Sequence, residues 1–379
     1  MIKSFEVTGL HDQPDQKVSF VLNPDLNILT GRNGSGKTTL LKLLWYMISP
    51  NVERAIGELT FRRAKVVTEE FSLTIEREAG RQDKPIRITF VEGKKKPLEV
   101  ELPFQGLVVP VDLERVDAVN LRIDSLPSGS VFFPTFRRIE GGYSIDQLRR
   151  PARFARPGMS GISEAIAMYA DSISVHKHRF VASVSTDDVE HLLTRQYADV
   201  SEQANNLHLE LSQFISETVP KASRKPGRGD RVDVGELLAA LKLLDDIRTK
   251  LADVDRKRAA LLRPFDTLSD LIADFFKDKG ITVSSNLTFG EVKEAIRASV
   301  LSAGEKQMLS FLSYNAFVEK TPIFIDEPEL SLHGDWQRRL FPTLLGQGTT
   351  NQFIVSTHSP FIYSKYPEKE LVLDFDKGD

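Results

Sequence analysis

The chain has 379 residues, of which 41% are hydrophobic, so it can bury a sizeable core in one or two domains. Lys and Arg total 50 against 53 Asp and Glu, a net charge of −3, so overall charge predicts no polyanionic partner. The lack of cysteine excludes disulfides, thiolate zinc sites and cysteine nucleophiles. No apolar run approaches the roughly 18 residues that cross a bilayer, and the N-terminus lacks the apolar stretch of a signal peptide. We therefore expect a soluble, cytoplasmic protein without membrane partners.

The first 30 residues predict strands. Phe5–Leu10 and Val18–Leu22 suggest a pair, and Leu26–Thr30 is a short apolar run that leads into glycines. Beyond the glycines, apolar residues recur at helical spacing until Pro50. These residues are Leu40, Leu41, Leu43, Leu44 and Met47.

The segment between this strand and this helix reads Gly31-Arg-Asn-Gly-Ser-Gly-Lys-Thr38, which matches the phosphate-binding loop pattern. Glycines let the backbone approach phosphate, and the helix that follows adds its positive N-terminal end. Lys37 is expected to reach the β- and γ-phosphates, and Thr38 to ligate Mg²⁺. The residues expected to contact ATP here are Arg32, Asn33, Gly34, Ser35, Gly36, Lys37, Thr38 and Thr39.

The middle of the chain is less regular. Residues 58–123 are rich in Val, Ile, Thr and Phe and predict antiparallel strands, with Gly93–Lys96 as a charged turn. Residues 131–161 mix Pro, Gly and Arg and predict a loop with short elements.

Residues 187–262 predict two long helices. Apolar residues of the first recur every three and four positions: Leu193, Tyr197, Val200, Ala204, Leu207, Leu211 and Phe214. A heptad in the second places Leu237, Leu244 and Leu251 at one seam position and Ala240, Ile247, Val254 and Leu261 at the other. We predict a hairpin with arms of about 30 residues, or roughly 45 Å. A helical subdomain packed on the core is the alternative.

Two segments are locally basic, residues 149–156 and the turn-rich tip 220–231 between the two helices. Each could neutralise a few phosphates of a nucleic acid. The slightly negative total charge favours a solvated loop or a docking site for an acidic protein, so DNA or a phage protein stays open as a further partner.

Ser302-Ala-Gly-Glu305 is a capping box that predicts a helix start at Ser302. Such a start offers unpaired amides, a hydroxyl and a positive dipole end, and Gly304 leaves space for a phosphate. In a dimer, Ser302, Gly304 and Glu305 could complete the γ-phosphate site of a partner subunit. The alternative is a plain helix cap.

Two short apolar runs, 321–327 and 352–357, predict buried parallel strands with function at their carboxyl ends. Asp326 could hold Mg²⁺, and Glu327 could accept a proton from the attacking water. His358 follows the second strand and could hydrogen-bond the γ-phosphate. A helix cap for the carboxylates and a structural role for the histidine are the alternatives.

The order of these motifs resembles that of ABC-type ATPases. About 265 residues separate Gly36 from the Leu301-Ser-Ala-Gly-Glu305 signature, a spacing similar to that of the Rad50, SMC and RecF branch. The segment Phe133–Glu140 looks like one in the ATPases of bacterial phage-defence systems. Those include relatives of the overcoming-lysogenisation-defect proteins and the ATPase subunit of the phage anti-restriction-induced system.

The resemblance implies an α/β fold: an ABC-type ATPase head with an antiparallel β subdomain and an inserted helical hairpin. Expected domains are an N-terminal lobe (1–180), the hairpin (181–275) and a C-terminal lobe (276–379). It also implies a head-to-head dimer with composite ATP sites. Lys37, Thr38, Asp326, Glu327 and His358 of one subunit would face Ser302 and Gly304 of the other.

Some positions depart from the family pattern. Ala303 stands where many relatives have a second glycine, and His333 where many have aspartate, which leaves communication between the two sites open. The glutamine that usually senses Mg²⁺ has two candidates, Gln105 and Gln147. Without cysteine, the hairpin tip cannot carry the zinc hook of Rad50 relatives.

These observations predict an ATPase that uses ATP and Mg²⁺ as a dimerising switch in anti-phage defence. Only about 20 residues follow His358, so we expect the effector, a nuclease or toxin, to be a separate chain. The alternatives are a DNA-binding repair ATPase related to Rad50 or RecF and an ATP-bound scaffold with little turnover.

Overall fold

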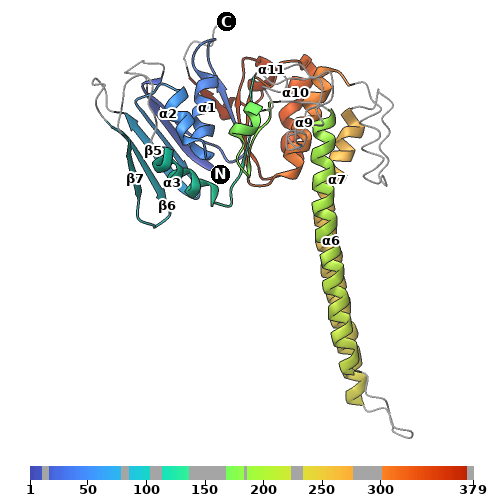
Figure 1. The fold of residues 1–379 in the computed structure, drawn as a ribbon. Coiled ribbons are helices and arrows are strands. Elements are labelled where there is room, and N and C mark those ends of the chain that lie inside the picture. The colour runs from blue at the N-terminus through green and yellow to red at the C-terminus, as the bar shows by residue number, and fades with distance from the viewer. Residues whose placement is uncertain are drawn as a thin grey trace, which may run out of the picture. The chain divides into compact units, whose positions relative to one another are not determined.

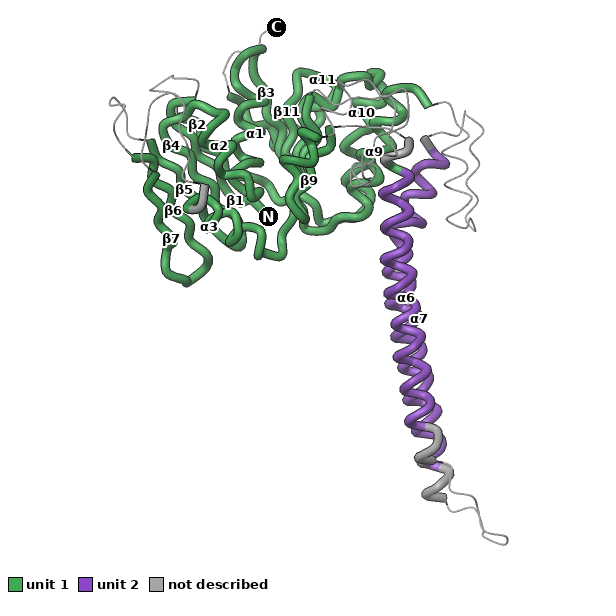
Figure 2. Tube along the Cα trace, viewed as in Figure 1, with its two compact units in different colours: residues 1–189, 300–379 green, residues 190–299 purple. Residues whose placement is uncertain are grey.

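The computed structural model describes most of the chain. The described residues are 1–10, 17–77, 85–102, 113–135, 168–182, 186–222, 234–275 and 301–373. They form two compact units, one of residues Met1–Val189 with Val300–Asp379 and one of residues Glu190–Ser299 (Figure 2). Both candidate glutamines, Gln105 and Gln147, and the basic segment 149–156 lie outside the described residues.

The first unit contains an antiparallel sheet of six strands in the order β2-β1-β4-β5-β6-β7, of which Figure 1 labels β5, β6 and β7. The strands are β1 (Ile2–Thr8), β2 (Lys17–Val21), β4 (Arg63–Thr68), β5 (Phe71–Arg77), β6 (Ile86–Glu92) and β7 (Leu98–Leu102). Burial alternates along β5 and β6, as in a sheet with one face on the core and one toward solvent. The predicted pairing of the first two strands and the charged turn after β6 are confirmed.

The same unit contains a parallel sheet of six strands in the order β12-β3-β11-β10-β8-β9. The strands are β3 (Leu26–Thr30), β8 (Ser130–Phe133), β9 (His178–Phe180), β10 (Pro322–Asp326), β11 (Gln352–Ser356) and β12 (Glu370–Val372). Every residue of β3, β10 and β11 is buried, which explains their unbroken apolar runs. Because the pairing is parallel and in register, their carboxyl ends meet at one edge.

The helices of this unit are α1 (Lys37–Ile48), α2 (Val52–Glu58), α3 (Leu113–Asp124), α9 (Ala303–Phe317), α10 (Gly334–Gly346) and α11 (Pro360–Tyr363), with a 3₁₀ turn, η4 (Pro367–Lys369). Part of the predicted strand region 58–123 is therefore the helix α3. Strand β8 begins at Ser130, where the sequence predicted a loop from residue 131. Its four residues are too few for periodicity to reveal a strand.

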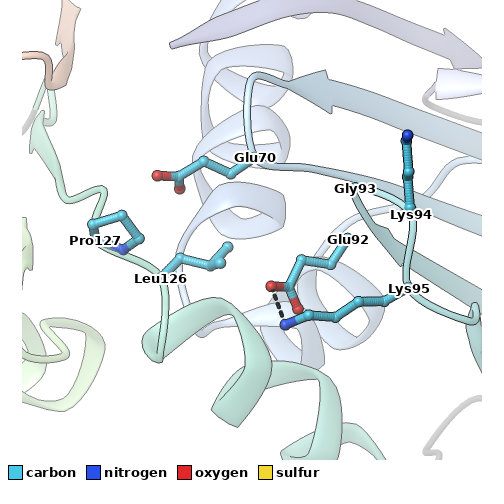
Figure 3. Close-up of a pocket in the computed structure, with 7 residues that line it drawn as sticks. All are labelled: Glu70, Glu92, Gly93, Lys94, Lys95, Leu126 and Pro127. Atoms are coloured by element: carbon cyan, nitrogen blue, oxygen red, sulfur yellow. Dashed lines mark hydrogen bonds and ion pairs between the residues drawn. The ribbon is translucent and has the colours of Figure 1, made fainter.

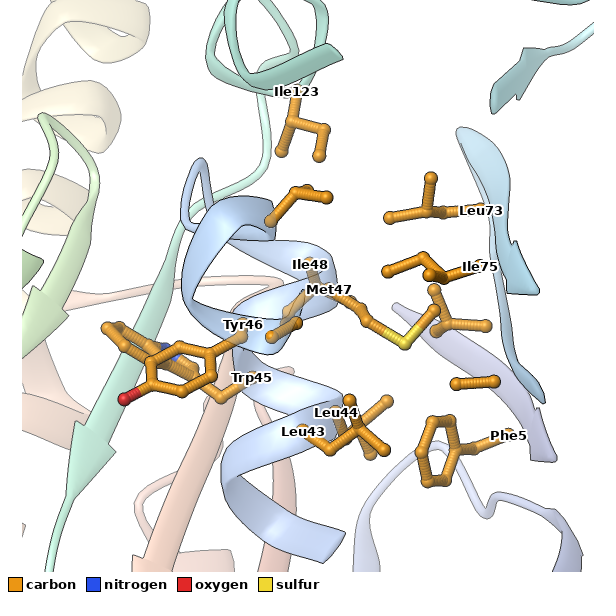
Figure 4. Close-up of a cluster of buried hydrophobic side chains, with 14 of the residues drawn as sticks. Phe5, Leu43, Leu44, Trp45, Tyr46, Met47, Ile48, Leu73, Ile75 and Ile123 are labelled. Atoms are coloured by element: carbon orange, nitrogen blue, oxygen red, sulfur yellow. The ribbon is translucent and has the colours of Figure 1, made fainter. Parts of the chain in front are cut away.

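Helix α1 lies between the two sheets. It contacts β4 of the antiparallel sheet and β8, β10 and β11 of the parallel sheet. Figure 4 shows Met47 directed toward Leu73 and Ile75, while Trp45 and Tyr46 lie on another side of the helix. A helix enclosed in this way is apolar around most of its circumference, so the core holds α1 and the residues that precede it in place.

A buried polar chain connects α1 to the far strands of the parallel sheet. Trp45 Nε1 donates to Ser130 Oγ at 2.9 Å, and Ser130 Oγ bonds His178 Nδ1 at 2.8 Å. Burial lowers the pKa of His178 from 6.5 to about 4, the nearby positive charge of Lys177 adding to the effect and Asp124 opposing it. His178 is therefore neutral at physiological pH and serves as a hydrogen-bonding core residue.

The described part of the second unit is a helical hairpin of α6 (Thr186–Ala222), which begins at the end of the first unit, and α7 (Val234–Phe275). Tyr197 and Phe265 meet edge-to-face with ring centroids 5.8 Å apart, so the two helices pack side by side (Figure 2). Their lengths of 37 and 42 residues correspond to about 55 and 63 Å, longer than predicted. Pro264 lies inside α7, where its ring removes one backbone hydrogen bond.

One predicted seam of α7 is wrong. Leu244 and Leu251 are 63% and 45% exposed, whereas Val254 of the other predicted position is 1% exposed. The two sets share the same seven-residue spacing, so periodicity alone could not decide which one faces α6. The fold class, α/β with an antiparallel sheet and an inserted helical hairpin, is confirmed. Among the described residues, no helix is apolar over a stretch long enough to span a bilayer.

Candidate nucleotide site

The glycine-rich turn joins the buried end of β3 to the first residue of α1. Gly34 and Gly36 have φ angles of 81° and 90°, a region that side-chain-bearing residues rarely adopt. A Cβ atom on Gly34 would meet no heavy atom within 4 Å. The backbone there is open on the side where a side chain would stand, as a close approach of phosphate requires.

Ser35 has an unsatisfied hydroxyl inside this turn. Its Oγ is buried and has no hydrogen-bond partner among the described residues. A buried polar group left in this state costs about 1–3 kcal/mol. An acceptor such as a phosphate oxygen would satisfy it, so the loop fits the anion that its pattern predicts.

Lys37 is buried and folds back onto the loop. Its Nζ donates to the carbonyl oxygens of Gly31 and Arg32, both at 2.9 Å. Burial lowers the pKa of Lys37, while the negative charges of Glu327, Asp326 and Glu329 oppose that shift. Three carboxylates from the far end of the sequence therefore lie within electrostatic reach of this ammonium group.

Asp326 ends strand β10 and is fully buried. Thr38 Oγ1 donates to its Oδ1 at 3.1 Å. Ser356 Oγ donates to the same oxygen, and Thr135 Oγ1 donates to Oδ2. Hydroxyl donors from three other segments thus hold the carboxylate at the sheet edge, next to the start of α1.

Glu327 follows directly and has an unusual backbone. Its φ is 49°, in the left-handed region, and its N–H donates to the carbonyl of Ser356 at 2.9 Å. Such a conformation costs free energy in a residue with a side chain and is common at functional sites. The hydrogen bond to β11 fixes the direction in which the chain leaves the sheet.

His358 lies two residues beyond β11. Burial lowers the pKa of its imidazole, with a further contribution from Lys37, while Glu329 and Asp326 act in the opposite direction. The backbone N–H of His358 donates to Glu329 Oε1 at 2.7 Å. The neutral imidazole is therefore within electrostatic reach of the lysine and of two of the carboxylates.

The predicted capping box is present at the start of α9. Ser302 N–H donates to Glu305 Oε2 at 2.6 Å, and Glu305 N–H donates to Ser302 Oγ at 3.4 Å. A Cβ on Gly304 would lie 2.4 Å from the carbonyl oxygen of Ser331. Packing within the protein itself therefore requires glycine at position 304, because the loop after β10 lies against it.

The structure brings together the predicted residues Lys37, Thr38, Asp326, Glu327 and His358. Sequence reasoning missed Thr135, Ser356 and Glu329 as neighbours of this group. Ser356 ends a predicted strand next to Asp326, a signal that could have been used. Thr135 and Glu329 follow strand ends as well, but their role depends on which strands are adjacent in the sheet.

A separate surface pocket of about 550 Å³ lies elsewhere in the first unit (Figure 3). It is lined by Glu70, Glu92, Gly93, Lys94, Lys95, Leu126 and Pro127. Lys95 Nζ and Glu92 Oε1 form an ion pair at 2.6 Å across one side. None of these residues belongs to the group around Lys37, so this pocket is distinct from the nucleotide site.

A phosphate loop after the buried strand of a parallel sheet, with a carboxylate at the tip of a nearby strand, defines the class of P-loop nucleotide-binding proteins. The particular family follows from comparison: residues 26–364 match the family described as "AAA domain, putative AbiEii toxin, Type IV TA system". The chain belongs to this family of ATPases. The resemblance to ABC-type ATPases, including those associated with defence systems, which the motifs indicated, is thereby confirmed.

Solved structures similar to this chain include two Smc head domains. One, from Pyrococcus furiosus, has an extended coiled coil and is bound to the C-terminal domain of ScpA. It shares 13% identity over 96% of this chain and 91% of its own, with a TM-score of 0.38. Another, with a coiled coil and joint, is from Pyrococcus yayanosii and shares 12% identity over 96% and 93%, with a TM-score of 0.34. Because these sequence identities and TM-scores are low, the assignment of the chain to its ATPase family rests on the family match and the geometry of the site.

Proposed function

We propose that this protein is an ATP-hydrolysing switch whose two copies share ATP between them and thereby control a separate effector in anti-phage defence. One observation carries the ATPase part: Lys37, at the start of α1, is within electrostatic reach of Asp326, Glu327 and Glu329 at the tip of β10. A phosphate-binding lysine and a set of carboxylates are the groups that phosphoryl transfer to water requires.

The residues present fit ATP with Mg²⁺. The unsatisfied Ser35 Oγ and the open backbone at Gly34 suit phosphate oxygens. Thr38 Oγ1 and Asp326 Oδ1 are oxygen ligands already 3.1 Å apart, and oxygen is the ligand atom that Mg²⁺ prefers. When bound, the metal ion would neutralise charge on the phosphates. Lys37 would then leave the carbonyls of Gly31 and Arg32 and donate to the phosphates.

Glu327 is the residue proposed to activate water. It directly follows the proposed metal ligand Asp326, and its backbone is fixed by Ser356. Its carboxylate would accept a proton from water as the water attacks the terminal phosphate. His358 would donate a hydrogen bond from its ring to a phosphate oxygen and so register whether that phosphate is present.

The start of α9 is the proposed contribution from a second copy. Ser302 caps the helix with its side chain, and the first turn of α9 carries the positive end of the helix dipole. Placed against the terminal phosphate bound by another subunit, this turn would make nucleotide binding and dimerisation one event. Hydrolysis would then weaken the pairing.

The defence role and the effector rest on the family. Its description names a putative AbiEii toxin and a type IV toxin–antitoxin system, which supports a role connected with a toxin. The exposed leucines of α7, among them Leu244 and Leu251, could take part in binding a partner protein.

The test is turnover and assembly of wild type and Glu327→Gln. Wild type should hydrolyse ATP in a Mg²⁺-dependent way. The Gln variant should lose about 100-fold or more in kcat while keeping ATP affinity and accumulating as an ATP-bound dimer in sizing experiments. Equal rates for the two proteins would exclude Glu327 as the base, and negligible turnover by wild type would favour the scaffold alternative. Salt-dependent DNA binding with recovery of repair proteins alone from cells would favour the repair alternative.

A further inference from the structure

We infer that Glu329 is a positioning residue for His358, an inference that rests on the proposed ATPase function. Glu329 Oε1 accepts a hydrogen bond of 2.7 Å from the backbone N–H of His358. Glu329 follows β10 and His358 follows β11, which are neighbours in the parallel sheet. One side chain therefore ties together the segments that leave two adjacent strands at the proposed catalytic edge.

The second oxygen of the same carboxylate is available to another donor. Glu329 Oε2 is buried and has no hydrogen-bond partner among the described residues. A buried carboxylate oxygen in this state is unfavourable, so packing alone does not account for the residue. Glu329 Oε2 can therefore accept a hydrogen bond from one more N–H group.

The imidazole of His358 is the donor that we assign to Oε2, which the ring would reach by rotating, because Oε2 accepts no hydrogen bond from the described residues. The negative charge of Glu329 acts on both His358 and Lys37, which places both within its reach. Lys37 Nζ already donates to the carbonyls of Gly31 and Arg32. A hydrogen bond from one ring nitrogen to Oε2 would fix the tautomer of His358 and direct the other nitrogen.

The loop that carries Glu329 is held independently of this carboxylate. Gln337 Nε2 donates to the backbone carbonyls of Leu332 at 2.8 Å and Glu329 at 3.4 Å, and Ser359 Oγ donates to Gln337 Oε1. Gln307 Nε2 donates to the carbonyl of Pro328 at 2.7 Å. Changing the Glu329 side chain therefore leaves the backbone around it anchored, so the variants should fold.

Two substitutions separate the charge of Glu329 from its contact with the backbone. Glu329→Gln keeps an oxygen for the N–H of His358 and removes the charge, and Glu329→Ala removes both. Glu368→Gln at an exposed site is the matched control. We expect Glu329→Gln to lower kcat for ATP about tenfold, the low end of the loss known for hydrogen-bonding partners of metal-bound histidines, with ATP affinity within about twofold and the control unchanged.

A double-mutant cycle distinguishes a positioning role of Glu329 from a merely structural one. If Glu329 acts through His358, Glu329→Ala should lower kcat in wild type but not further in His358→Ala. Losses that simply multiply in the double variant would overturn the inference. Hydrogen–deuterium exchange gives a second readout, because the amide of His358 should exchange faster in Glu329→Ala than in Glu329→Gln.

Different results would contradict the proposed ATPase function and the positioning role of Glu329. A wild-type protein that does not hydrolyse ATP would contradict the proposed function. A wild-type protein that does hydrolyse ATP, with Glu329→Gln indistinguishable from it, would contradict the positioning role alone. Unchanged exchange of the His358 amide in Glu329→Ala would also contradict that role, and this measurement needs no turnover.

Discussion

Thr38 Oγ1 donates a hydrogen bond to Asp326 Oδ1 over 3.1 Å, although the two residues are 288 positions apart in the chain. The hydroxyl belongs to the first turn of α1 and the carboxylate to the tip of β10. The two proposed metal ligands thus lie side by side. Binding of Mg²⁺ would only require the hydroxyl to turn a lone pair toward the metal ion.

Asp326→Asn should abolish Mg²⁺-dependent turnover while preserving the fold. Asparagine keeps an oxygen that can accept from Thr38 and Ser356 but lacks the charge that draws a divalent cation. We expect kcat to fall by about 100-fold or more, and the Mg²⁺ dependence of ATP binding to weaken. ATPase assays and nucleotide titrations with and without Mg²⁺ measure both effects.

The control for this experiment is Asp335→Asn. Asp335 is an exposed carboxylate near the start of α10, paired with Arg338 at 2.8 Å. Its loss should leave turnover unchanged. Retained Mg²⁺-dependent hydrolysis in Asp326→Asn would show that another group binds the metal ion.

Mixing two inactive variants should restore activity if ATP is shared between subunits. Lys37→Met removes the ammonium group that a subunit contributes to its own ATP site. Ser302→Asp places a negative charge in the part of the site that comes from the partner subunit. Aspartate still caps a helix, so α9 should remain intact. A mixed dimer has one site with both changes and one with neither, so an equal mixture should recover about a quarter of wild-type sites.

The matched control for Ser302→Asp is Ser302→Asn, which caps the helix without adding charge and should lose far less activity. ATPase assays of each variant alone and of the mixtures show whether ATP is shared between subunits. If every mixture is as inactive as its components, the start of α9 does not act on the nucleotide of a partner subunit.

Gly304→Ala should destabilise the protein even though alanine favours helix. A Cβ would lie 2.4 Å from the carbonyl oxygen of Ser331, a backbone atom that cannot rotate away. We expect a loss of about 1–3 kcal/mol, which exceeds the gain of up to about 1 kcal/mol in helix propensity. Gly57→Ala in α2, where a Cβ meets nothing within 4 Å, should stabilise by about 0.4–1 kcal/mol. Thermal unfolding of both variants compares the two effects, and an unchanged melting temperature for Gly304→Ala would show that the loop gives way freely.

His178 should make the protein less stable in acid. Its pKa is about 4 in the folded protein, against 6.5 for an unperturbed histidine such as that of the unfolded chain. Between these values the unfolded chain binds a proton that the folded chain does not. The stabilisation is complete above pH 6.5 and is lost as pH falls toward 4. The slope reaches about 1.4 kcal/mol per pH unit.

His178→Gln should flatten the pH dependence of the melting temperature between about pH 7 and 5. It should also lower stability at neutral pH, because the hydrogen bond to Ser130 changes. His208→Gln, at an exposed position of α6, is the matched control. A steep profile that persists in His178→Gln would assign the acid sensitivity to another group.

Much of the site was predictable because its signals are local. The glycine turn, the capping box at Ser302 and the fully apolar strands at 322–326 and 352–356 each depend on neighbouring residues, and the structure has all of them. Parallel strands place their carboxyl ends together, so the meeting of Lys37 with Asp326 could be inferred.

The rest depends on contacts between distant segments. The requirement for glycine at position 304 comes from Ser331, and the importance of Glu329 comes from a backbone group beyond the neighbouring strand. Strand β12 has three residues and exists through its pairing with β3. No periodicity in a single segment contains this information.

The order of strands in the parallel sheet has a consequence for synthesis. Strand β3, which holds the phosphate loop, lies between β11 and β12, and its register joins Leu26 to Phe353 and Ile28 to Glu370. The antiparallel sheet, by contrast, is complete once residue 102 has been made. While a ribosome is still translating, the nascent chain can form that sheet early but has no neighbours for β3. Such contacts between distant residues form late, so the ability to take up nucleotide arises only after residue 372 has been made.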